Sequence, residues 1–237
     1  MPDPKEIDIL NMYINNQDSI FIDCGANAGF YTIPISSFNK KCTTISFEPS
    51  NIEFKKLNAN IKLNSLKNII TEKIAVSNKV KDLIYREQGM TAKSFSSGAG
   101  HIVDKILDKK LDYKIKAITI DSYFKKFKIK RKTKMIMKFD LEGHDLKAIY
   151  GATKTINKYQ PLILFEFSKW IINDPEYSKK KFNNFLKKNN LVILNLHKKT
   201  LNVNMLHQEI NKLDKEHDTI GNLIILKKNN LKKIKFF

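Results

Sequence analysis

Short apolar runs alternate with longer segments of helical spacing along most of the chain, and this alternation restricts the fold more than any other feature. The runs predicted to be strands are residues 19–23, 43–48, 69–75, 135–140, 162–167, 191–196 and 222–226. Between them, apolar residues recur at three- and four-residue spacing in the predicted helices 51–63, 144–158 and 176–189. This order is typical of a parallel sheet covered by helices, so the sequence predicts an α/β, doubly wound sheet of about seven strands.

The length of the chain favours one domain. Its 237 residues suffice for one large α/β core, because domains usually span about 100–200 residues. We therefore predict a single domain over 1–237, with a helical lead-in at 1–18. Apolar runs at 83–87 and 117–119 indicate extra short strands, and the insertion at 78–116 is expected to shape the substrate side.

The stretch FIDCGANAGFY is a candidate ligand loop. It leads from a strand ending in Asp23, through Gly25 and Gly29, into a helix expected from about Phe30. Glycine lets a ligand approach the main chain closely, and Asn27 tolerates a left-handed turn. Such a loop at the carboxyl edge of a sheet can bind a cofactor, although a glycine after a strand is as often a plain turn.

An acidic residue at the end of the next strand, Glu48, narrows the class of ligand. It follows Asp23 by twenty-five residues, close to the ~20-residue offset at which a carboxylate binds a ribose diol in such folds. The glycine spacing is G-x-x-x-G rather than G-x-G-x-x-G, which disfavours a nicotinamide dinucleotide. S-adenosyl-L-methionine has no phosphate and carries an amine, for which Asp23 is a natural partner. The sequence therefore favours this methyl donor as the cofactor.

A second polar cluster, in the segment 135–145, follows a later strand and is expected at the same edge of the sheet. Asp140, Glu142 and His144 alternate there, so one or two of them can face a substrate. Asp140 is the first candidate for a base or hydroxyl orienter and His144 the second, while Glu142 would hold the acceptor or Asp140. The alternative is that the two acids cap the following helix. Glu166 lies inside an apolar strand, where a carboxylate needs a partner or a site role.

Several segments together resemble the FkbM-type S-adenosylmethionine-dependent methyltransferases: FIDCGANAGFYT, ISFEPS, IAVSN, MKFDLEGHDLKAIYGA and PLILFEFS, with a weaker match in GNLIILKK. The resemblance implies a class I methyltransferase fold with an antiparallel last strand. It also implies O-methylation of a hydroxyl on a sugar, glycan or secondary metabolite, with S-adenosyl-L-methionine as the methyl donor.

The same resemblance assigns residues to the site. The cofactor-binding residues that it implies are Asp23, Gly25, Ala26, Asn27, Gly29, Glu48, Pro49, Ala75 and Val76. It places Asp140 and Glu142 on the reaction side, and His144 departs from the family pattern, which usually has a small or apolar residue there. Substrate contacts are expected in the segment 94–100.

A formal net charge of +19 makes a nucleic-acid methyltransferase the main rival among enzymes. Nearly all of the positive charge is lysine, with Arg86 and Arg131 as the two arginines, and compositional drift produces the same bias. The Asp/Asn-Pro-Pro-aromatic tetrad typical of base-amino methylation is absent after the fourth strand, where D-L-E-G stands. A noncatalytic module that binds the cofactor is the alternative from another class.

Neither an export signal nor a membrane span is visible, which predicts a cytoplasmic protein. The two cysteines, Cys24 and Cys42, are expected to be reduced thiols. No ligand spacing requires a metal, so none is predicted. A metal-assisted variant of the reaction stays open, because Asp140, Glu142 and Glu166 are hard oxygen donors. The expected partner is a small-molecule or glycan hydroxyl, and the sequence identifies neither this acceptor nor the oligomeric state.

Overall fold

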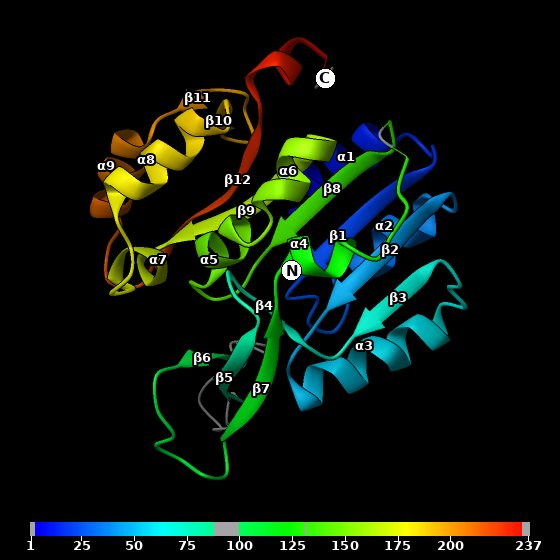
Figure 1. The fold of residues 1–237 in the computed structure, drawn as a ribbon, viewed down its shortest axis with the longest axis horizontal. Coiled ribbons are helices and arrows are strands. Elements are labelled where there is room, and N and C mark those ends of the chain that lie inside the picture. The colour runs from blue at the N-terminus through cyan, green and yellow to red at the C-terminus, as the bar shows by residue number, and fades with distance from the viewer. Residues whose placement is uncertain (1–2, 88–99, 131, 234–237) are drawn as a thin grey trace.

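A central mixed sheet runs through the part of the chain that the computed structural model describes, residues 3–87, 100–130 and 132–233 (Figure 1). Its strands lie in the order β11-β10-β12-β9-β8-β1-β2-β3. The strands from β3 to β9 in this order are parallel, whereas β12 is antiparallel to both of its neighbours. Their bounds are β1 Ser19–Cys24, β2 Cys42–Phe47, β3 Ile69–Glu72, β8 Lys134–Phe139, β9 Leu162–Ser168, β10 Leu191–Leu194, β11 Thr200–Leu201 and β12 Thr219–Lys227. The predicted sheet with an antiparallel last strand is confirmed, and the two-residue strand β11 is added at its edge.

A second sheet of four strands is inserted between β3 and α4, and it appears below the central sheet in Figure 1. Its order is β4-β7-β5-β6, with bounds β4 Ala75–Val76, β5 Lys81–Arg86, β6 His101–Val103 and β7 Asp112–Ile118. The extra strands predicted near 83–87 and 117–119 correspond to β5 and β7. The prediction of one strand over 69–75 is wrong, because β3 ends at Glu72 and Ala75 pairs with Ala117 in the second sheet.

Helices cover both faces of the central sheet. They are α1 Pro4–Ile14, α2 Thr32–Phe38, α3 Asn51–Leu63, α4 Ile120–Phe124, α5 Asp145–Tyr150, α6 Thr153–Tyr159, α7 Lys169–Asn173, α8 Lys179–Lys188, α9 Val203–Lys212 and the 3₁₀ segment Lys228–Lys233. Successive strand residues point to opposite faces. Thus Phe21 and Ile136 pack with α1 and α2, whereas Ile22 and Met137 pack with the core that includes α4, α5, α6, α8 and α9. In the described part, no helix is both long and apolar enough to cross a bilayer.

The helix predicted over 144–158 is divided into α5 and α6, which corrects that prediction. The carbonyl of Gly151 accepts a hydrogen bond from the N–H of Asp121 instead of continuing the helical ladder. The carboxylate of Asp121 then accepts from the N–H groups of Lys154 and Thr155, at 2.9 and 2.8 Å, and so caps the start of α6. Asp121, thirty or more positions away along the chain, thus contacts the end of one helix and caps the start of the next.

Candidate active site

A cavity of about 940 Å³ lies where the loops after β1, β2, β8 and β9 face the inserted sheet. Its volume is within the range of about 300–1,000 Å³ usual for small-molecule sites. The predicted site residues that line it are Gly25, Asn27, Glu48, Pro49, Ala75, Val76, Asp140, Glu142 and His144. The remaining predicted ones, Asp23, Ala26 and Gly29, are not among the described residues of its wall. The structure therefore brings most of both predicted clusters to one cavity.

The N–H groups of the loop after β1 are bonded within the protein. Those of Gly25 and Ala26 both donate to the carbonyl of Phe47, at 2.9 and 3.0 Å. The N–H of Asn27 donates to Glu48 Oε2 at 2.8 Å, and Asn27 has the left-handed φ of 51° that was expected. At these positions a ligand would meet the surface of the main chain rather than unpaired N–H donors.

The two positions at which this loop requires glycine do so for different structural reasons. Gly25 has a φ of 79°, and a Cβ there would lie 2.0 Å from the carbonyl oxygen of Asp140. Gly29 has a φ of 98°, and its Cβ would meet the side chains of Ile33 and Leu57 at 3.0 Å. Gly25 therefore lets the loops after β1 and β8 touch, whereas Gly29 lets the chain pack against α2 and α3.

Asp23, Lys138 and Asp140 form a charged cluster beside this loop. Asp23 lies opposite Lys138 in the register of β1 and β8, and their side chains are 0% and 2% exposed. Lys138 Nζ lies 3.0 Å from Asp140 Oδ2, 3.7 Å from Asp23 Oδ1 and 4.4 Å from the centre of the Tyr31 ring. The Thr32 hydroxyl donates to Asp23 Oδ2 at 2.7 Å. Asp23 thus lies between Lys138 and Thr32, at the end of β1 where the loop begins.

Burial alone would lower the pKa of Lys138, but the carboxylates of Asp140 and Asp23 outweigh it and raise that pKa. Burial raises the pKa of Asp23, and the ammonium of Lys138 opposes that shift. Lys138 therefore remains a cation that connects the ends of two neighbouring strands.

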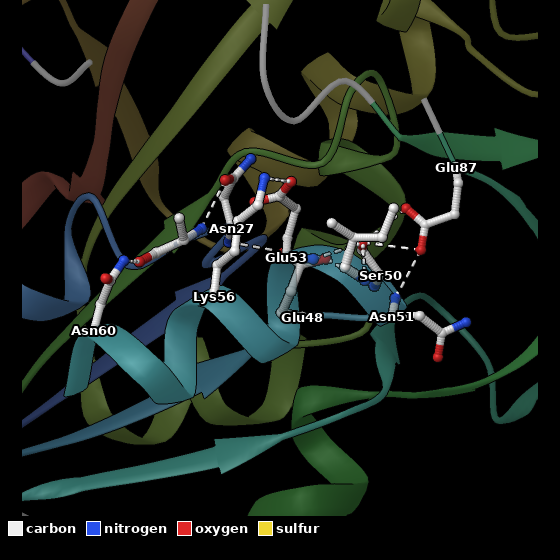
Figure 2. A network of polar contacts seen from close by, with 10 residues as sticks. Asn27, Glu48, Ser50, Asn51, Glu53, Lys56, Asn60 and Glu87 are labelled. Atoms are coloured by element: carbon white, nitrogen blue, oxygen red, sulfur yellow. Dashed lines mark hydrogen bonds and ion pairs between the residues drawn. The ribbon is translucent and has the colours of Figure 1, made fainter. Parts of the chain in front are cut away.

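Glu48 is fixed between the loop after β1 and the start of α3 (Figure 2). Its Oε2 accepts from the N–H of Asn27 and its Oε1 from the N–H of Ser50, both at 2.8 Å. Next to it, Glu87, which follows β5, accepts from the Ser50 hydroxyl at 2.8 Å and from the N–H of Asn51 at 2.7 Å. The inserted sheet is thereby attached to α3, and each oxygen of Glu48 keeps a further lone pair for a ligand.

Glu48 makes the stability of the protein depend on pH. Burial raises its pKa to about 7 from the ordinary 4.5, although the N–H donors of Ser50 and Asn27 oppose the shift. Because the folded-state pKa is the higher one, this group's stabilising contribution is present below the unfolded pKa and is lost as pH rises through the folded one. We expect it to lower the free energy of unfolding by about 3 kcal/mol across that interval, and Glu48→Gln to remove this part of the slope.

Urea unfolding of both proteins between about pH 4 and 8 measures the difference. Glu209→Gln is the matched control, because the Glu209 side chain is 52% exposed and pairs with Lys212 on the surface. Parallel pH profiles for the wild-type protein and Glu48→Gln would contradict the prediction.

Asp140 and Glu142 bring two carboxyl groups to the cavity from the loop after β8. The Asp140 side chain is 38% exposed. Burial raises the pKa of Glu142 to about 7, with a further contribution from Asp140 and Glu166. Glu142 has a φ of 50°, and a Cβ on the next residue, Gly143, would lie 2.6 Å from Trp170 Cβ. This tight turn holds the partly exposed Asp140 and Glu142, whose pKa is raised to about 7, in one short loop.

His144 lies on the cavity wall, is 7% exposed and is the N-cap residue that precedes α5. Its Nε2 lies 2.9 Å from the hydroxyl oxygen of Ser77, which follows β4. Burial, together with the charge of Lys147, lowers the pKa of His144 to about 4. The contact with Ser77 joins the loop after β8 to the inserted sheet. The predicted substrate segment 94–100 lies outside the described residues except for Gly100, which lines the cavity.

Sequence reasoning missed several polar residues of the wall. The Tyr31 hydroxyl donates to Glu6, and Asn222 Nδ2 donates to Glu6 Oε1 at 2.9 Å. Glu6 and Asn222 are 216 positions apart, so no local pattern connects them. Lys138 could have been found, because it is a charged residue in an apolar strand, the same signal that singled out Glu166. Both of these residues line the cavity.

Comparison of the sequence with known proteins assigns the chain to a protein family. A family model described as a methyltransferase FkbM domain matches residues 23–217. A curated relative, tRNA(Phe) (4-demethylwyosine(37)-C(7)) aminocarboxypropyltransferase from Methanocaldococcus jannaschii, is 28% identical over 153 residues. The match covers 63% of this chain and 58% of that protein, so the chain spans less than two thirds of the relative's length.

Solved structures share the fold. The crystal structure of methyltransferase FkbM from Methylobacillus flagellatus has a TM-score of 0.50 at 15% identity, covering 92% of this chain and 47% of that one. A candidate rRNA methylase from Clostridium thermocellum has a TM-score of 0.52 at 11% identity, covering 94% and 95% of the two chains. At such low identities the likeness concerns the fold.

Proposed function

Since the chain belongs to the FkbM methyltransferase domain family, we propose that it transfers a methyl group from S-adenosyl-L-methionine to a hydroxyl of a sugar, glycan or secondary metabolite. The position of Asp140 is the observation that supports a hydroxyl group as the methyl acceptor. Its partly exposed carboxylate faces the cavity, and its main chain touches the glycine loop at Gly25.

The residues of the cavity fit S-adenosyl-L-methionine, the cofactor of this family. Gly25 and Asn27 offer bare main chain, and Glu48 has the acceptor oxygens that a ribose diol requires. Ala75 and Val76 add apolar surface for an adenine. The cofactor supplies a methyl group that is already activated by a positively charged sulfonium, and an acid-rich wall suits that charge.

The protein's own part in the reaction is to align the acceptor and to remove its proton. We assign Asp140 to the hydroxyl, as hydrogen-bond acceptor and base, and Glu142 to holding either the acceptor or Asp140. A positioned base contributes about 10² to 10⁴ in rate, and alignment contributes further. His144 holds the loop in place through Ser77, while Asp23, Ala26 and Gly29 support the shape of the cofactor loop.

The proposal is tested with tritium-labelled methyl donor and cell extract separated into small-molecule, glycan and RNA fractions. We expect label in a small-molecule or glycan product whose mass spectrum shows a new methyl ether. Label only in RNA would contradict the proposal. Binding of S-adenosylhomocysteine, the demethylated product, without transfer to any fraction would instead favour a noncatalytic binding module.

A nucleic-acid acceptor is the second candidate. Its support is the net charge of +19 together with the printed function of the curated relative, which acts on tRNA. A nucleic-acid substrate would bind with an affinity that falls steeply as salt rises, because its phosphates release counterions when lysines contact them. Titration of a transfer RNA at several salt concentrations separates the two candidates.

A further inference from the structure

The wall of the cavity is acidic in a protein that is basic overall. Among the described residues that line it, seven are Asp or Glu and one is Lys, whereas the whole chain has a net charge of +19. Besides Glu48 and the two acids of the loop after β8, they include Glu6 on α1, Glu166 on β9 and Asp218 just before β12. The acids thus come from elements around the cavity and not from one loop.

The lysine of this wall is already paired. Lys138 contacts Asp140 and Asp23, lies over the Tyr31 ring and is 2% exposed. The lowered pKa of His144, about 4, keeps that ring uncharged at neutral pH. An acceptor with a phosphate would therefore meet carboxylates in the described wall, without an available ammonium to offset its charge. Placing like charges side by side in this way disfavours anionic ligands.

Glu142 in the loop after β8, Glu166 on β9 and Trp170 on α7 all line the cavity, and we call these three residues the acceptor side. Burial raises the pKa of both Glu142 and Glu166. The charge of Asp140 contributes to both shifts, and the charge of Glu166 contributes to that of Glu142. Trp170 on α7 is 47% exposed, lines the cavity and packs on Gly143, directly after Glu142. The Trp170 ring lies 5.2 Å from the ring of His101, centre to centre, and an exposed indole in an acidic wall can bind a cation on its face.

We propose that the acceptor side selects a hydroxyl acceptor that also carries an ammonium group, as an amino sugar does, and excludes acceptors with a phosphate near the reacting hydroxyl. The inference rests on the proposed methyl transfer. The methyl donor has a net charge of +1, which offsets only a small part of the negative charge of the wall. An ammonium has three N–H donors, which the oxygens of Glu142 and Glu166 can accept.

A cation at this position would also favour the ionised form of Glu142. Since the pKa of Glu142 is about 7, binding at pH 7 would release protons from the protein. A neutral sugar would not have this effect. Proton release is therefore a signature of the ammonium that does not depend on catalysis.

Isothermal titration of the protein saturated with S-adenosylhomocysteine provides the test. Glucosamine, N-acetylglucosamine and glucose 6-phosphate are the three probes, each in two buffers of different ionisation enthalpy at pH 7. We expect glucosamine to bind about tenfold or more tightly than N-acetylglucosamine, with a buffer-dependent heat, and glucose 6-phosphate to bind weakest. In the double variant Glu142→Gln/Glu166→Gln the preference should fall to about threefold or less.

Glu209→Gln/Asp214→Asn is the matched control, because it also replaces two carboxyl groups by amides, at side chains that are 52% and 64% exposed. It should keep the full preference for glucosamine. Equal or weaker binding of glucosamine, no detectable binding of it, or tighter binding of an RNA oligonucleotide would each overturn the inference. The labelled-methyl assay on the small-molecule and glycan fractions separates this failure from that of the proposed function. If a hydroxyl acceptor is methylated but glucosamine is not preferred, the inference about the ammonium fails and the proposed methyl transfer stands.

Discussion

Replacing Asp140 by Asn is expected to lower the turnover of methyl transfer by about 10² to 10⁴, because the amide cannot accept the proton of the acceptor hydroxyl. Asn has nearly the same shape, and the main chain at Asp140 still touches Gly25. The affinity for S-adenosylhomocysteine should therefore change by about threefold or less. Single-turnover transfer from labelled donor gives the rate, and calorimetry gives the affinity.

Two checks accompany this variant. Asp18→Asn is the control, since Asp18 is exposed and precedes β1, at the end of the strand opposite to the cavity. The variant also leaves Lys138 with Asp23 as its remaining carboxylate partner, at 3.7 Å, so urea unfolding must show that it still folds. An equal loss of turnover and of cofactor affinity would assign Asp140 to the cofactor rather than to the acceptor.

Gly25→Ala is expected to abolish binding of S-adenosylhomocysteine and to lower the free energy of unfolding by more than about 3 kcal/mol. Two effects add. A left-handed φ costs a residue with a side chain about 1–3 kcal/mol. The new methyl group would also lie 2.0 Å from the carbonyl oxygen of Asp140, so the loops after β1 and β8 would have to move apart.

Gly221→Ala separates these effects. Gly221 has a φ of 81°, almost that of Gly25, but a Cβ there meets no atom within 4 Å. Its unfolding should therefore show the conformational cost alone. Because Gly221 also lines the cavity, the comparison of the two variants concerns stability and not ligand binding. If urea unfolding gave the same loss for both variants, the close approach of the two loops would be irrelevant to stability.

The sequence was sufficient for those features that depend on neighbouring residues. The strands of the central sheet are apolar runs, and Asn27 and Glu48 stand at fixed offsets from strand ends, so their places were predictable. Helix α3 was predicted from its apolar spacing at the bounds that the structure shows, and the structure adds that Ser50 supplies a side-chain cap at its start. In each case the physical cause lies within a few residues of its effect.

The features that were missed depend on contacts between distant segments. The division of the helix at Gly151 comes from Asp121, and the pairing of Asp23 with Lys138 comes from the register of two strands that are far apart in the sequence. For the same reason, Asp23 was assigned to the ligand as an isolated acid, without the lysine that faces it. Register and tertiary capping are not encoded by local periodicity.

The segregation of charge also determines how ligands arrive. At a distance a cationic ligand encounters the field of the whole basic surface and is repelled, whereas within the cavity it meets the carboxylates around Glu142 and Glu166. Dissolved ions screen the long-range repulsion over a Debye length of about 8 Å in physiological salt, and they screen partly buried groups much less. Ionic strength therefore speeds the encounter of cations with this protein, and it leaves their retention in the cavity largely unchanged.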